Sequence, residues 1–92
     1  MYEDIERGNF NRPELGAFFF CAHKLAGLQN EEGKLLFSAI RRHLRKTNIS
    51  LKVQRKIELE CVKNRKTPEA TALKFEICVS LMTAGQRTRR FN

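Results

Sequence analysis

Residues 49–61, ISLKVQRKIELEC, decide how the fold is interpreted, because apolar and polar side chains alternate along almost all of this stretch. Arg55 alone breaks the alternation. A second alternating stretch, TALKFEICVSL, covers residues 71–81. A period of two is typical of half-buried β-strands. The two stretches in series therefore predict an antiparallel β-hairpin, whose loop falls within residues 63–70.

The same residues also allow helices, and that alternative stays open. Thr67, Pro68 and Glu69 combine a capping residue, a proline and an acid in the order typical of a helix start. A helix over residues 68–84 would gather apolar side chains on one face: Ala70, Leu73, Ile77, Leu81 and Ala84. Residues 50–62 are likewise rich in helix-forming types. The alternative fold is all-α, with four short helices.

Upstream of the alternating stretches, the sequence predicts two helices. The first covers Pro13–Ala26, with proline at the first helical position and Gly27 just past the end. Its expected core residues recur at helical spacing: Leu15, Phe18, Phe19, Ala22, Leu25 and Ala26. The second begins near Asn30, and the short loop over residues 28–30 predicts that the two helices are antiparallel neighbours. The fold prediction is therefore α+β: two antiparallel N-terminal helices followed by a β-hairpin.

The length of 92 residues fits a single small domain. We expect a flexible N-terminal arm over residues 1–11, a globular domain over 12–84 and a basic tail over 85–92. The first helix is apolar on most sides, which is typical of a helix at the centre of a domain or in a dimer interface. We therefore expect a homodimer, or a partner protein, to contact three of its residues: Phe18, Phe20 and Cys21.

The charge of the chain is unevenly distributed. The formal net charge is +8, but residues 1–30 carry −1 and residues 31–92 carry +9. An uneven basic surface attracts polyanions, of which nucleic acid is the commonest. The sequence therefore predicts a small, non-enzymatic nucleic-acid-binding protein.

The predicted contact residues begin with the cluster at the end of the second helix: Arg41, Arg42, Arg45 and Lys46. Cations complement a helix C-terminus, but four in six residues exceed that need. Arginine also suits phosphate, because its planar fork offers two parallel donors. We assign to the same surface the loop residues Lys63, Arg65 and Lys66 and the tail residues Arg87, Arg89 and Arg90. Lys52, Arg55 and Lys56 could join the loop group from the preceding strand.

Most phenylalanines fall on predicted core faces, so few aromatic rings are free to stack on bases. Contact with the phosphate backbone of an RNA or DNA duplex is therefore expected rather than base recognition. The alternative function is a small viral or phage-type accessory or inhibitor module, which would bind a larger host protein through its apolar helix and basic face. A structural subunit of a ribonucleoprotein or virion fits the same residues.

No catalytic, cofactor or metal motif is present. Cys21 and His23 are two residues apart and would point away from each other on a helix, so neither a zinc site nor a Cys–His nucleophile is expected. The three cysteines are odd in number, and an acidic start over residues 1–6 is unlike a secretory signal. With no membrane span either, we expect reduced thiols and a cytoplasmic or nuclear location.

Overall fold

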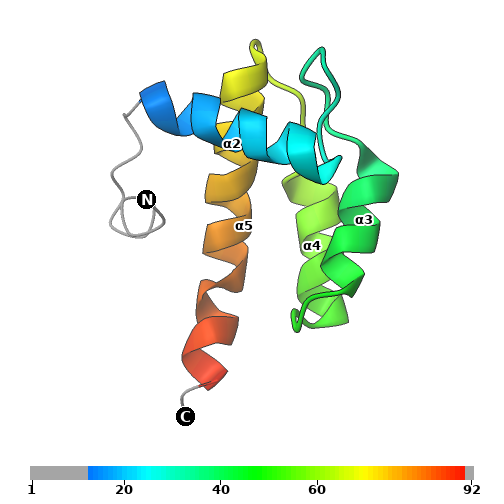
Figure 1. Ribbon diagram of the computed structural model, residues 1–92. Coiled ribbons are helices and arrows are strands. Elements are labelled where there is room, and N and C mark those ends of the chain that lie inside the picture. The colour runs from blue at the N-terminus through cyan, green and yellow to red at the C-terminus, as the bar shows by residue number, and fades with distance from the viewer. Residues whose placement is uncertain (1–12, 91–92) are drawn as a thin grey trace.

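The computed structural model describes residues 13–90, which form four α-helices and no strand (Figure 1). The helices are α2 (Pro13–Ala26), α3 (Phe37–Arg45), α4 (Leu51–Glu60) and α5 (Pro68–Arg90). The predicted arm over residues 1–11 lies outside the described residues. Residues 85–90, which the sequence analysis placed in the tail, belong to the last turns of α5.

The predicted β-hairpin is wrong, and its first strand is helix α4. Ser50 caps this helix, because its side chain accepts a hydrogen bond of 3.3 Å from the backbone N–H of Val53. Ile57 is fully buried, whereas two apolar members of the alternating pattern, Leu51 and Leu59, are 68% and 79% exposed. The alternation therefore did not mark a buried face, and the helical period decides which residues enter the core.

The predicted second strand is helix α5, which starts where the alternative interpretation placed a helix. The hydroxyl of Thr67 accepts a hydrogen bond of 3.0 Å from the backbone N–H of Ala70, and Pro68 is the first helical residue. Thr71, Ala72 and Phe75 are buried at helical spacing. The all-α alternative with four helices is confirmed, although α5 is long rather than short.

The expectation that the first two helices are antiparallel neighbours is also wrong. The second helix begins at Phe37, not near Asn30. The side chain of Asn30 accepts hydrogen bonds from the backbone of Glu32 and Lys34, so it closes a turn instead of capping a helix. An isolated bridge between Gln29 and Leu35 completes this connection.

The antiparallel pair is instead α3 and α4, which lie beside α5, while α2 crosses the N-terminal half of α5 (Figure 1). Two apolar clusters hold these helices together. The larger one joins α3, α4, α5 and the α2–α3 connection through Leu28, Leu35, Ile40, Leu44, Ile57, Cys61 and Phe75. The smaller one joins α2 to α5 through Leu15, Phe19 and Ala72.

A disulfide between Cys61 and Cys78 links the end of α4 to α5, with Cα atoms 5.5 Å apart. The expectation of three reduced thiols is wrong for this pair, whereas Cys21 is free and exposed. Over residues 13–90, no helix has the length and apolar character needed to cross a membrane.

We expect Gly33→Ala to destabilise the fold by about 2 kcal/mol or more. Gly33 has φ of 91°, and an added Cβ would come within 2.4 Å of the Cβ of Pro68. Gly27→Ala is the matched control, because Gly27 has φ of 77° but open space around it, so only the backbone strain of about 1 kcal/mol applies. Urea unfolding measures both, and equal losses would contradict the close approach.

Labelling of thiols tests the disulfide. After purification in air and unfolding without reductant, iodoacetamide should add one group, at Cys21, because Cys61 and Cys78 are joined. After reduction it should add three groups, one for each cysteine of the chain. Intact mass spectrometry reads the number directly, and three groups without reductant would contradict the linkage.

Candidate nucleic-acid interface

The positive charge of the protein belongs to one structural unit. Residues 34–66 hold eleven Lys and Arg against two Glu, a net charge of +9, whereas the rest of the chain sums to −1. This stretch contains α3, α4 and the connections on either side of them. All eleven basic side chains are exposed. The basic surface is therefore the α3–α4 hairpin and its flanks, and the packing of α2 on α5 contributes little to it.

The structure divides the predicted α3 cluster between two sides of the helix. The guanidinium of Arg41 pairs with Glu58 of α4, with Nε 2.5 Å from Oε1, and lies over the ring of Phe37 at 5.0 Å from its centroid. Arg45 follows one turn later and shares the side of α3 that faces α4. The charge of Arg41 is thus partly neutralised within the protein, and that of Arg45 has no ion-pair partner among residues 13–90.

Arg42 and Lys46 lie on the other side of α3, toward the end of α2. With His43 they line a pocket of about 260 Å³ whose opposite wall is formed by Gly27 and Leu28. This pocket brings three nitrogen-bearing side chains to one opening. The four residues that the sequence analysis grouped together therefore serve two different surfaces.

Helix α4 carries three further cations on its outward face. Lys52, Arg55 and Lys56 are exposed and lie within the first two turns. The positive end of a helix dipole disfavours Lys52, which lies in the first turn of α4, and that turn contains no acidic residue. The helix dipole therefore does not explain Lys52, whereas it does explain part of the cluster at the end of α3.

The predicted loop group lies at the opposite end of α4. Lys63, Arg65 and Lys66 are exposed, and the loop that carries them is fixed by two hydrogen bonds. The backbone N–H of Leu35 donates to Oδ1 of Asn64 at 2.9 Å, and that of Arg65 donates to the hydroxyl of Thr71 at 2.8 Å. The length of α4, about 15 Å, separates this group from Lys52.

The predicted tail residues Arg87, Arg89 and Arg90 lie in the last turns of α5, whose C-terminal end extends away from α2 (Figure 1). This end of α5 does not join the loop group, which lies where α5 begins. The sequence analysis therefore named three basic groups that occupy three separate places in the fold.

The predicted interface residues of α2 also separate. Phe18 is 48% exposed and Cys21 is exposed, whereas Phe20 is half-buried and packs with the smaller apolar cluster. Leu25, which was expected in the core, is 87% exposed. Phe18, Cys21 and Leu25 follow one another at helical spacing and form an outward stripe, which we call the α2 apolar face.

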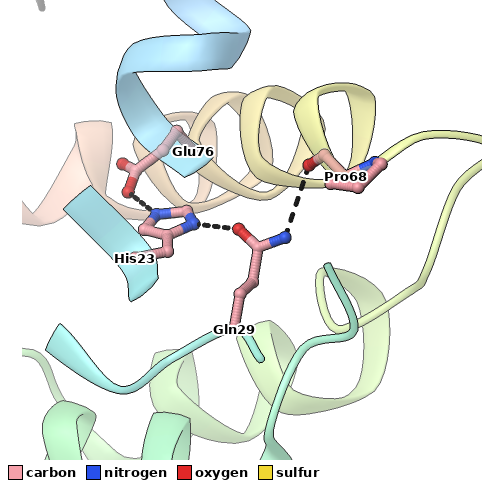
Figure 2. Close-up of polar contacts among 4 residues, drawn as sticks. All are labelled: His23, Gln29, Pro68 and Glu76. Carbon is pink, nitrogen blue, oxygen red and sulfur yellow. Dashed lines mark hydrogen bonds and ion pairs between the residues drawn. The ribbon is translucent and has the colours of Figure 1, made fainter. Parts of the chain in front are cut away.

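A buried polar chain centred on His23 was not predicted from the sequence (Figure 2). Nδ1 of His23 lies 2.6 Å from Oε1 of Gln29, and Nε2 lies 2.6 Å from Oε1 of Glu76. The side-chain amide of Gln29 donates to the carbonyl oxygens of Gly33 at 2.7 Å and Pro68 at 3.3 Å. The chain ties α2, the α2–α3 connection and α5 together, and it fixes one wall of the pocket beside Arg42.

No group of His, Cys, Asp and Glu within residues 13–90 has the arrangement needed to hold a metal ion. No family model matches the sequence, and neither the curated proteins nor the solved structures contain a significant match.

We expect His23→Phe to lower the free energy of unfolding by about 2–4 kcal/mol, because Gln29 and Glu76 would each lose a hydrogen-bond partner at a buried or partly buried site. His43→Phe is the matched control: His43 is exposed, so its replacement should change stability by no more than about 0.5 kcal/mol. Urea unfolding followed by circular dichroism measures both variants. Similar losses for the two would contradict a structural role for the His23 chain.

Proposed function

We propose that the protein binds the phosphate backbone of nucleic acid through the outward side of the α3–α4 hairpin. Four residues define this α3–α4 basic face: Arg45, Lys52, Arg55 and Lys56. The observation that carries the proposal is that three exposed cations share one face of α4, and the first of them, Lys52, lies in the first turn, where it opposes the helix dipole. A cation that lowers the stability of its own helix is expected to serve another purpose. Binding of an anionic partner, which would neutralise this positive charge, is such a purpose.

A polyanion suits this face better than a single small anion. The cations are spread over two helices, so no single phosphate could contact all of them. A nucleic-acid backbone offers successive negative charges, and each neutralised phosphate releases a condensed counterion. Leu51 and Leu59 are exposed beside this face and cannot stack on a base, and the exposed ring of Phe37 on α3 is covered by the guanidinium of Arg41 at 5.0 Å. Contact with the backbone of a duplex, RNA or DNA, follows from this composition.

The other basic groups would extend the contact without forming its centre. Lys63, Arg65 and Lys66 lie at the far end of α4, so a bound duplex would have to run along that helix to reach them. The arginines near the end of α5 would add affinity without sequence preference.

The Cys61–Cys78 disulfide is at odds with the expected cytoplasmic or nuclear location. In such reducing compartments, cysteine pairs are kept as free thiols. In those compartments the contact between α4 and α5 would depend on packing within the larger cluster, to which α4 contributes Ile57 and α5 contributes Phe75. The disulfide therefore favours an oxidising location, or a protein that becomes cross-linked after leaving the reducing one.

A second proposal is binding to a partner protein, either a host protein or a second copy of this chain, through the α2 apolar face. The observation in its favour is that Phe18 and Leu25, two turns apart, are exposed on the same side of a helix whose opposite side is buried. In this case the basic surface would speed association with an acidic partner.

We expect Lys52→Glu to weaken duplex binding by roughly tenfold, as one charge-assisted phosphate contact is lost. It should also reduce the slope of log K against log salt by about 1. The added acid in the first turn of α4 favours the helix, so lost binding would not reflect unfolding. Lys74→Glu is the matched control, with the same charge change at an exposed site on α5. Fluorescence anisotropy against duplex RNA and DNA at two salt concentrations gives both quantities.

Two outcomes would contradict the proposal. One is the absence of binding to either duplex at low salt, and the other is an equal effect of Lys52→Glu and Lys74→Glu. Phe18→Glu distinguishes the second proposal from the first, because this change in the α2 apolar face should leave duplex binding nearly unchanged. If it instead abolishes binding to a partner or converts a dimer to a monomer in light scattering, the α2 apolar face is the interface.

A further inference from the structure

A second pocket adjoins the basic one, and it differs in character. It has a volume of about 160 Å³ and lies between α3 and α5. Its walls are mainly apolar: Leu28, Ile40, Leu44, Ile49, Phe75 and Val79. Its volume is close to that of the engineered cavity of roughly 150 Å³ that binds benzene in another protein. The pocket therefore has the size of one aromatic ring or a short alkyl group.

The two pockets share two lining residues, Leu28 and His43. His43 is exposed, so its ring is free to turn without disturbing the core. A ligand that spans both pockets would pass beside this ring. Its apolar part would occupy the space between α3 and α5, and its polar end would reach the opening that Arg42 and Lys46 line.

The charges around the two pockets define the orientation of such a ligand. Arg42 and Lys46 supply positive charge at one end, and no acidic residue lines that pocket. At the other end the one carboxylate is Glu76, whose Oε1 already lies 2.6 Å from Nε2 of His23. A negative group is therefore attracted to the Arg42 end and repelled from the Glu76 end.

We propose that the joined pockets bind a small amphiphilic anion, an aromatic or short-chain carboxylate or sulfonate, with its charged group at Arg42 and Lys46. The apolar part is removed from water against Ile40, Leu44 and Phe75. The anion gains charge-assisted hydrogen bonds from the guanidinium and ammonium groups. This site lies on the side of α3 that faces α2 and α5, so the proposal does not rest on nucleic-acid binding by the α3–α4 basic face.

The probe for the test is benzenesulfonate, whose single ring matches the volume of about 160 Å³ between α3 and α5, and isothermal titration calorimetry follows its binding. We expect saturable binding of one molecule per chain. The double variant Arg42→Gln/Lys46→Gln should weaken it at least fivefold, whereas Arg45→Gln, whose side chain does not line the pocket, should weaken it by no more than about twofold. The uncharged analogue methyl phenyl sulfone should bind more weakly than the sulfonate and respond little to the double variant.

A second variant addresses the apolar end. Val79→Phe would fill the pocket between α3 and α5, and it should reduce probe binding while circular dichroism shows an unchanged helix content. Two-dimensional NMR of the unmodified protein would place the probe by shifts at Leu28, Ile40 and Phe75. Absence of saturable binding, equal effects of the double variant and Arg45→Gln, or loss of binding in Phe18→Glu would overturn the proposal. The last result would assign the probe to the α2 apolar face.

Discussion

The arrangement of this fold depends on the hydrogen bonds of one buried side chain, His23. Both ring nitrogens face oxygen atoms, one on Gln29 and one on Glu76, so the ring joins the end of α2 to α5 and to the connection that leads into α3. Gln29 extends the chain to the carbonyl oxygens of Gly33 and Pro68. Because helices α2 and α3 make little direct contact, this polar chain is the polar link between α2 and the connection that leads into α3. Together with the larger apolar cluster, it determines how the α3–α4 hairpin is placed against α5.

The failure of the strand prediction has a specific physical origin. A spacing of four residues is even, so residues at i, i+4 and i+8 satisfy both a helical and a strand pattern. In α5 the effect is doubled, because the helix packs on two sides at once. Phe75 and Val79 enter the larger cluster, whereas Leu73 and Ile77 pack against the smaller one. Two helical stripes offset by two residues produce an alternation that the sequence alone does not distinguish from a strand.

The sequence predicted the total positive charge of the candidate site, but it did not predict how the basic residues are arranged in space. The excess of basic residues after residue 30 and the cluster at the end of the second helix are both evident in the sequence, as are the bounds of α2. The division of Arg45 from Arg42 depends on which side of α3 faces α4, and tertiary packing alone decides this. A strand would place Arg55 opposite Lys52 and Lys56, whereas helix α4 brings all three to one face.

The two proposed anion sites lie on one short helix, and this proximity couples them. Arg42 and Arg45 are three residues apart on α3, a spacing that puts Cβ atoms about 5–6 Å apart, which is within the Debye length of about 10 Å at 0.1 M salt. An anion held at Arg42 would therefore lower the positive potential that a phosphate experiences at Arg45. Such coupling is reciprocal, so bound nucleic acid would lower the affinity of the protein for the small anion by the same factor. Its magnitude would fall as salt rises, whereas a coupling transmitted through the packing of α3 would persist.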